Sequence, residues 1–131
     1  HAGDFASHLI EHELGGMFDV THGAGLAAIW STWARYVYKD CLPRFVRYAI
    51  EVMQVEPGET DEETALRGIA AMEEFYKEIG MPTRIHELGI LPTDEQCRAM
   101  AKSCMQASGG KKGEAKVLYE EDIYNIYKAA L

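Results

Sequence analysis

The spacing of apolar residues is the feature that most constrains the fold of this chain, because it follows the period of an α-helix almost throughout. Between Leu66 and Ile79, for example, apolar side chains recur every three or four positions and form one wide apolar face. No segment alternates apolar and polar residues as a half-buried strand does, and no repeat or low-complexity tract is present. The pattern predicts an all-α, bundle-like fold of several helices.

Helix start and stop signals divide the chain into segments. Two segments are capping boxes: residues 60–63 (Thr-Asp-Glu-Glu) and 93–96 (Thr-Asp-Glu-Gln). In a capping box the hydroxyl of the first residue accepts from the backbone amide of the fourth, and the side chain of the fourth accepts from the backbone amide of the first. Gly15-Gly16 is expected to end the first helix, Pro43 to open another, and Gly80 to end a later one. The predicted helices are 5–14 (capped by Asp4), 24–39, one that Pro43 opens and Pro57-Gly58 ends, one from 60 to 79, a single turn at 84–88, one from 93 to 107, and 122–130.

Length, charge and cysteine content limit the classes of function. At 131 residues the chain can bury a core as one domain or as part of a larger protein, and we expect a fragment because it begins on His1 rather than Met. Its net charge of −8 without a Lys/Arg cluster argues against a nucleic-acid partner, and no apolar stretch reaches membrane-spanning length. Three unclustered cysteines favour a reducing cytoplasm. An apolar face bared by truncation would favour a homo-oligomer.

Three histidines, His8, His12 and His22, lie within fifteen residues near the start of the chain. Imidazole is the commonest metal ligand in proteins. His8 and His12 are four positions apart and so share one face of the predicted helix, whereas His22 follows the Gly15-Gly16 break. A helix, a turn and a second helix could therefore direct all three rings to one point. Another histidine, His86, is expected on a surface turn.

Two other interpretations of this region stay open from the residues alone. Residues 8–12 spell H-x-x-E-H, the inverted motif of zinc metallopeptidases, in which two histidines bind zinc and Glu11 would activate a water. That motif fixes only three positions, leaves His22 unused, and occurs among strands that are not predicted here. In the second interpretation the histidines are incidental and the chain is a non-catalytic helical interaction module. Glu11 and Glu13 are expected to face solvent or to hold the far nitrogen of a histidine.

Residues 3–14 and 19–27 together resemble the signature of the iron-containing (group III) alcohol dehydrogenases, in particular the butanol dehydrogenase-like branch. In that signature an H-x-x-x-H on a helix precedes a His-Gly-x-Gly turn, and the first and last histidines are fourteen positions apart, as His8 and His22 are here. Weaker likeness extends over residues 30–33, 73–83 and 121–127. The resemblance therefore covers most of the chain and is most specific at its start.

The resemblance implies roles for the three histidines. His8 and His22 match two metal ligands, and His12 matches a histidine that lies beside the metal, near nicotinamide and substrate, without bonding it; the alternative for His12 is a buried residue that locks its helix. The implied metal is iron, with zinc as the other candidate, and the implied substrate is a small primary alcohol or aldehyde. Residues 1–131 would then be part of the C-terminal, helical, metal-binding domain of a two-domain dehydrogenase.

The resemblance also implies what lies elsewhere in the whole protein. An Asp and a His that complete the metal site, and the domain that binds NAD or NADP, are expected upstream of this chain. We therefore expect the 131 residues alone to bind metal weakly and to be inactive.

Overall fold

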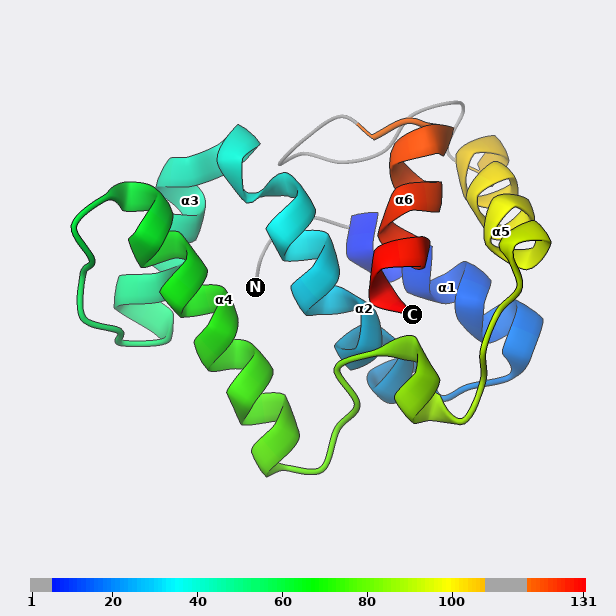
Figure 1. Ribbon diagram of the computed structural model, residues 1–131, viewed down its shortest axis with the longest axis horizontal. Helices are drawn as coiled ribbons and strands as arrows, with labels where there is room; N and C mark the ends of the chain where they lie inside the picture. Colours follow the sequence, from blue (N-terminus) through cyan, green and yellow to red (C-terminus); the bar gives the residue numbers. More distant parts are fainter. Residues whose placement is uncertain (1–5, 108–117) are drawn as a thin grey trace.

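The computed structural model describes residues 6–107 and 118–131, and the side chains of 9–106 and 118–131. Within these ranges the chain is helical and contains no β-strand, which confirms the all-α prediction (Figure 1). No helix in the described part is long and apolar enough to cross a membrane. In chain order the elements are α1 (Ala6–Phe18), α2 (His22–Val37), the 3₁₀ helix η1 (Tyr38–Cys41), α3 (Leu42–Arg47), the π-helical segment η2 (Tyr48–Val52), α4 (Asp61–Glu78), the 3₁₀ helix η3 (Ile85–Leu88), α5 (Asp94–Ala107) and α6 (Glu120–Ala130).

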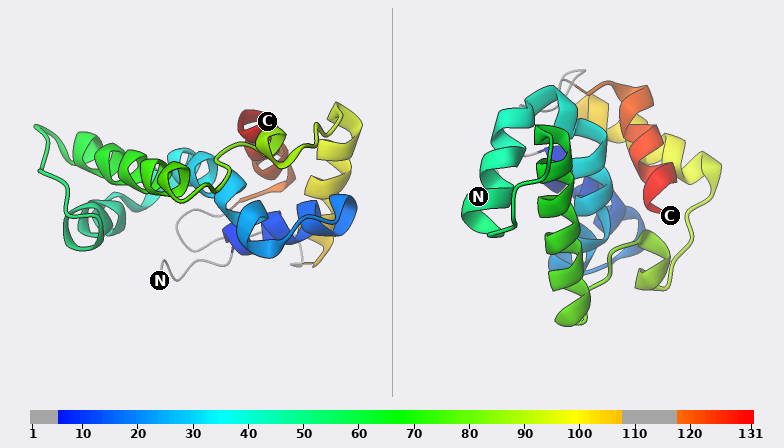
Figure 2. Two further views of the ribbon diagram at one scale, coloured as in Figure 1. Left: turned by 90° about the horizontal axis from the view of Figure 1, so that it is seen from below. Right: turned by 60° about the vertical axis from the view of Figure 1, so that its left-hand side comes forward.

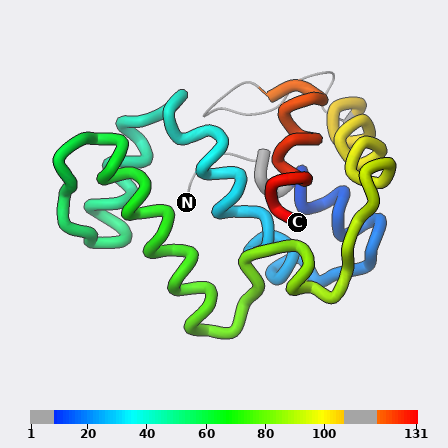
Figure 3. The backbone as a smooth tube through the Cα atoms, in the orientation of Figure 1, coloured from blue at the N-terminus to red at the C-terminus, as the bar shows by residue number. Residues whose placement is uncertain are grey.

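Helix α2 lies at the centre of the molecule. On one side it contacts α1 and α6, and α5 packs against both of these; on the other side it contacts α4, which packs against α3 and η2. Figure 1 and the left-hand view of Figure 2 show these two groups to the right and left of α2. The backbone tube in Figure 3 shows that the first and last helices share the half of the molecule away from α4.

The core follows the apolar faces that the sequence predicts. Trp33 on α2 is 1% exposed and packs its ring against that of Phe45 on α3, with centroids 6.2 Å apart. The Tyr127 hydroxyl on α6 donates to the backbone carbonyl of Ile10 on α1. The largest fully buried side chains come from both groups of helices: Trp33, Tyr127, Ile10, Leu14, Ile29, Ile69, Ile85, Met100, Leu118, Ile123, Ile126 and Val37.

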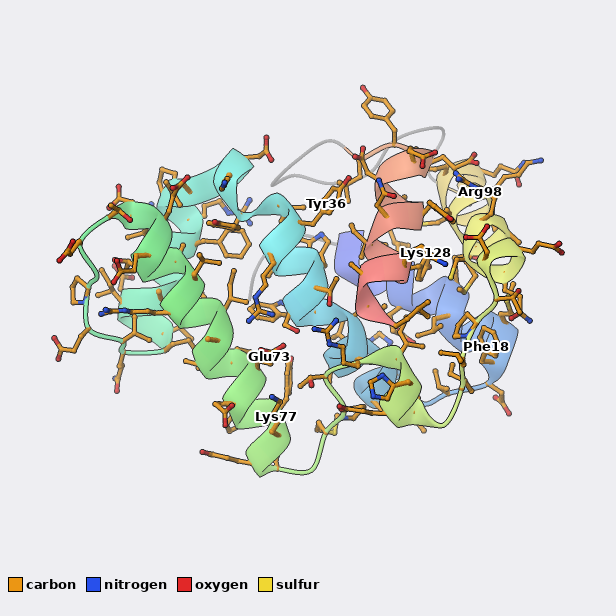
Figure 4. All side chains as sticks on the ribbon, viewed as in Figure 1. Phe18, Tyr36, Glu73, Lys77, Arg98 and Lys128 are labelled. Carbon is orange, nitrogen blue, oxygen red and sulfur yellow. The ribbon has the colours of Figure 1, made fainter. Side chains whose placement is uncertain are left out.

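Two polar contacts join α2 to the helices on either side of it, and Figure 4 labels one side chain from each, Glu73 and Tyr36. Glu73 on α4 accepts two hydrogen bonds from the Arg35 guanidinium, at 2.9 and 3.1 Å, and a third from Ser31 at 2.9 Å. The Tyr36 hydroxyl donates to Asp122 on α6 at 2.7 Å. Because these partners are 38 to 86 residues apart in the chain, they fix how the helices pack rather than the helices themselves.

The predicted end of the first helix is wrong. Helix α1 continues through Gly15-Gly16 to Phe18, and Asp19 follows in a left-handed conformation (φ 57°) with its amide bonded to the Gly15 carbonyl at 2.8 Å. Glycine inside a helix costs about 1 kcal/mol relative to alanine, and the partly buried Phe18, which packs against the core, offsets this. Asp4 and Phe5, predicted to start this helix, lie outside the described residues.

The helix that Pro43 was predicted to open ends with η2 at Val52, before Pro57-Gly58, whereas the other helix signals mostly act as predicted. Both halves of the 93–96 capping box form, with bonds of 2.8 and 3.1 Å between Thr93 and Gln96. In the 60–63 box the Thr60 hydroxyl accepts from the Glu63 amide at 3.1 Å, but the Glu63 carboxylate accepts from Arg67 instead of reaching back. Gly80 ends α4 with a φ of 80°.

Candidate metal centre

The contact between α1 and α2 brings the predicted site residues together. His12 lies on α1, one turn after His8, and His22 is the first residue of α2. An open hollow of about 280 Å³ lies between these helices and is lined by Glu11, His12, Gly15, Gly16, Val20 and His22. The structure describes the backbone of His8 but not its side chain, so the predicted convergence of His8 and His22 stays a prediction. His12 and His22 both line this hollow.

The best-defined contact in this hollow is between Glu11 and His22. A Glu11 carboxylate oxygen, Oε1, forms a short hydrogen bond with Nδ1 of the His22 ring. The Glu11 side chain is 3% exposed, whereas that of His22 is 62% exposed. An ionised carboxylate can only accept, so this contact favours the imidazole tautomer with its proton on Nδ1. A neutral imidazole in this tautomer is a metal ligand through Nε2.

Two glycines leave the space that the Glu11 side chain occupies. A Cβ atom added at Gly25, in the first turn of α2, would lie 2.7 Å from Glu11 Oε2 and 2.9 Å from its Cγ. A Cβ atom at Gly15, one turn after Glu11 on α1, would lie 3.0 Å from the same oxygen. Real Cβ atoms rarely approach other atoms so closely. Both positions therefore make room for the Glu11 carboxylate because they lack a side chain.

The donor set present suits a divalent metal. Ring nitrogens are ligands for both iron and zinc, and a ligating histidine usually gives its other N–H to a carboxylate or carbonyl, as His22 gives Nδ1–H to Glu11. Among the described side chains, no three His, Cys, Asp or Glu residues come close enough to hold a metal ion. His22 is therefore the ligand candidate in this part of the chain, and His12 lies exposed at the edge of the same hollow. Its exposure shows that His12 does not lock the helix as a buried residue.

The remaining site expectations have clear outcomes. Glu11 does not face solvent but holds a histidine nitrogen, the second of the two roles expected for it. Its burial and its bond to His22 also disfavour the zinc-peptidase interpretation, in which this carboxylate must contact a water. His86 is exposed, as expected, and its Nδ1 bonds the Leu131 carbonyl at 2.5 Å. The sequence reasoning missed the role of Gly25, for which the only local signal is its place three residues after His22.

Comparisons with known proteins find similarity along the whole length of the chain. The model for the C-terminal part of the Fe-containing alcohol dehydrogenase family matches residues 1–131. The chain is 37% identical over 130 residues to the probable NADH-dependent butanol dehydrogenase 1 of Bacillus subtilis, and 33% identical over 125 residues to NADH-dependent butanol dehydrogenase A of Clostridium acetobutylicum. These alignments cover 98% and 95% of this chain but 33% and 32% of the relatives. The chain thus spans about a third of the length of these curated relatives.

Solved structures show the same fold. The crystal structure of NADH-dependent butanol dehydrogenase A from Thermotoga maritima has a TM-score of 0.84 and 34% identity, covering 98% of this chain and 33% of that one. The substrate- and cofactor-free aldehyde reductase of E. coli has a TM-score of 0.86 and 25% identity, over 98% of this chain and 33% of that one. The resemblance found in the sequence is therefore confirmed over the whole chain.

Proposed function

Because this chain belongs to the iron-containing alcohol dehydrogenase family, as part of its C-terminal helical region, we propose that it comes from a metal-dependent, NAD(P)-linked dehydrogenase. The proposed reaction is the interconversion of small primary alcohols and aldehydes, of the butanol type, by hydride transfer. Support for the substrate class comes from relatives named as butanol dehydrogenases and as an aldehyde reductase. Support for the chemistry comes from the residues between α1 and α2.

We propose that His8 and His22 bind the metal and that His12 lies beside it without bonding it. The observation that carries this assignment is the bond from His22 Nδ1 to the buried Glu11 carboxylate, since it leaves Nε2 as the donor atom. Iron is the proposed metal because of the family, and zinc is the other candidate because neutral imidazoles suit both ions. A further Asp and His are proposed from the rest of the protein.

Each group in the hollow then has a task. When bound, the metal supplies Lewis-acid stabilisation of negative charge on a substrate oxygen, and a nicotinamide supplies the hydride acceptor. His12, exposed at the edge of the hollow, donates a hydrogen bond that orients the substrate oxygen. Glu11 holds the His22 ring in place.

Other properties of the whole protein follow as proposals. The nicotinamide nucleotide is bound mainly by a separate domain outside these residues, and either NAD or NADP is compatible with the chain. A cytoplasmic location is supported by the cysteines Cys41, Cys97 and Cys104, which form no disulfide in the described part of the chain. Homo-oligomer formation is supported by apolar side chains of α4 that lie partly exposed, among them Phe75 at 47%.

Zinc titration of the 131-residue chain tests the ligand assignment. We expect weak binding to the wild type, and a loss of roughly tenfold or more in His8→Ala and in His22→Ala, because each removes a ligand. The matched control is His86→Ala, which removes an exposed histidine that does not line the hollow and should leave the affinity unchanged. Isothermal titration calorimetry measures all four proteins. Equal affinities throughout would contradict the proposal and favour a helical interaction module.

The chain alone should not oxidise butanol when NAD or NADP and metal are added, since further ligands and the nucleotide domain are proposed to lie outside it. Nicotinamide absorbance measures the turnover. Steady reduction of the cofactor by the purified chain would show that these 131 residues contain a complete active site.

A further inference from the structure

We propose that Glu11 is a positioning residue of this centre, which sets the tautomer and orientation of His22, and that Gly15 and Gly25 form the seat for its carboxylate. This inference rests on the proposed function for the identity of the ion. Its effect on the His22 ring, however, is a property of the metal-free chain.

Glu11 is a buried acid that needs a hydrogen-bond donor. A carboxylate that is 3% exposed is costly unless a hydrogen-bond donor compensates it. In the described structure that donor is the His22 ring, which is itself largely exposed and belongs to the next helix. Because the buried Glu11 carboxylate bonds Nδ1 of His22, it holds that side of the ring in place while the rest of the ring lies exposed. The opposite nitrogen, Nε2, is the one proposed to bind the ion.

The Glu11 carboxylate fits closely against the backbone at Gly25 and Gly15. The Glu11 side chain passes so close to Gly25 that any Cβ there would lie 2.7–3.1 Å from three of its atoms. Oε2 also lies where a Cβ at Gly15 would come within 3.0 Å. With backbone on both sides, the carboxylate cannot accommodate an added methyl group without moving. Because its other oxygen bonds His22, such a movement weakens or breaks that bond.

A positioning role and a packing role of Glu11 predict different behaviour of the His22 ring. If Glu11 only fills space between α1 and α2, an isosteric amide serves as well, and the tautomer of His22 does not depend on it. If Glu11 positions the ring, removal of its charge lowers the preference for the Nδ1–H tautomer and weakens the bond from Nε2 to a metal. Changes to conserved partners of ligating histidines typically lower metal affinity by 10–100-fold.

The test compares two variants with two matched controls in the 131-residue chain. Glu11→Gln removes the charge at constant shape, and its control is Glu13→Gln, a half-buried acid two positions along the same helix. Gly25→Ala displaces the carboxylate, and its control is Gly23→Ala, whose Cβ would meet only Met81 Cε, at an ordinary 3.7 Å. Far-UV circular dichroism checks that each protein is folded.

Two readouts are measured. Long-range ¹H–¹⁵N NMR of the metal-free chain, at mildly alkaline pH where imidazole is neutral, reports the His22 tautomer. Calorimetric titration with Zn(II) reports the affinity. We expect Nδ1–H in the wild type and both controls, a shift toward Nε2–H in Glu11→Gln and Gly25→Ala, and a roughly tenfold or greater loss of zinc affinity in these two variants.

The outcomes separate this inference from the function on which it rests. If the wild type binds zinc and Glu11→Gln matches it in tautomer and affinity, the positioning role is refuted while the proposed metal site stands. If the wild type binds no zinc, the predicted weak metal binding by this chain is wrong, and the tautomer readout still shows whether Glu11 sets the ring. If Glu11→Gln does not fold, Gly25→Ala decides, and an unchanged Nδ1–H signal there refutes the role.

Discussion

Replacing Gly68 by alanine should destabilise the protein through one close contact between α4 and η2. A Cβ atom at Gly68 would lie 2.5 Å from the Cβ and 2.7 Å from the Cα of Ala49. Carbon atoms pack favourably at about 3.5–4.0 Å, so the added methyl group is roughly 1 Å too close. Ala49 is fully buried and one of the two atoms is backbone, so no side-chain rotation relieves the overlap. The two helical segments must move apart.

The magnitude follows from two opposing terms. Overpacking of this kind costs about 1–3 kcal/mol, and the involvement of backbone favours the upper end. Alanine is about 1 kcal/mol more favourable than glycine within a helix, which partly offsets this cost. The free energy of unfolding should therefore fall by about 2 kcal/mol in Gly68→Ala, or about 6 °C in Tm for a chain of this length. Gly16→Ala is the matched control, since its Cβ meets nothing within 4 Å, and it should gain about 0.5–1 kcal/mol.

Urea unfolding followed by tryptophan fluorescence measures these differences. The double variant Ala49→Gly with Gly68→Ala removes the shortest contact, so it should be more stable than the sum of the two single changes predicts. If Gly68→Ala and Gly16→Ala are equally stable, the reasoning from the α4–η2 contact is refuted.

Two further predictions concern stability and its dependence on pH. The Tyr48 hydroxyl is buried with no hydrogen-bond partner among the described residues, so Tyr48→Phe should be neutral or stabilising by about 1 kcal/mol in calorimetry. Burial also raises the pKa of Tyr48 to about 12. The free energy of unfolding should therefore fall as the pH rises from about 10 to 12, because the unfolded chain ionises this hydroxyl first, and Tyr48→Phe should reduce that fall. Hydrogen bonds from Arg35 lower the pKa of Glu73, so its contribution is complete above the unfolded pKa of about 4.3 and is lost as the pH falls below it. Glu73→Gln should reduce this acid sensitivity by about 1 kcal/mol or less, because the partly exposed Arg35 is screened by solvent; unchanged pH profiles in either variant would contradict these assignments.

Features set by neighbouring residues were predictable from the sequence. The capping box at Thr93 and the glycine end of α4 at Gly80 depend on groups within four positions, and both form. The helical class follows from apolar periodicity, which is also local information. The resemblance of residues 3–14 and 19–27 to a family signature, which includes the fourteen-residue spacing of His8 and His22, indicated the family that the comparisons then confirmed.

Features set by packing between helices were not predictable. Helix α1 continues past Gly16 because its last turn packs on the core, and no local signal outweighs the Gly-Gly pair. Segment η2 contains a π-helical hydrogen bond, from the Met53 amide to the Tyr48 carbonyl, and packs against α4. The close contact there depends on Gly68 of α4, which is distant from η2 in the sequence. Burial of Glu11 likewise requires Gly25, fourteen residues later. Such pairings are known only once the helices are docked.

Anomalous diffraction at the zinc absorption edge, from crystals of the zinc-loaded protein that contains this chain, tests the central claim most directly. The account predicts one peak between α1 and α2, about 2.1 Å from a ring nitrogen of His8 and from Nε2 of His22, with His12 nearby but beyond bonding distance. A peak bonded to His12, a peak bonded to His22 through Nδ1, or a peak elsewhere in the molecule would contradict the account.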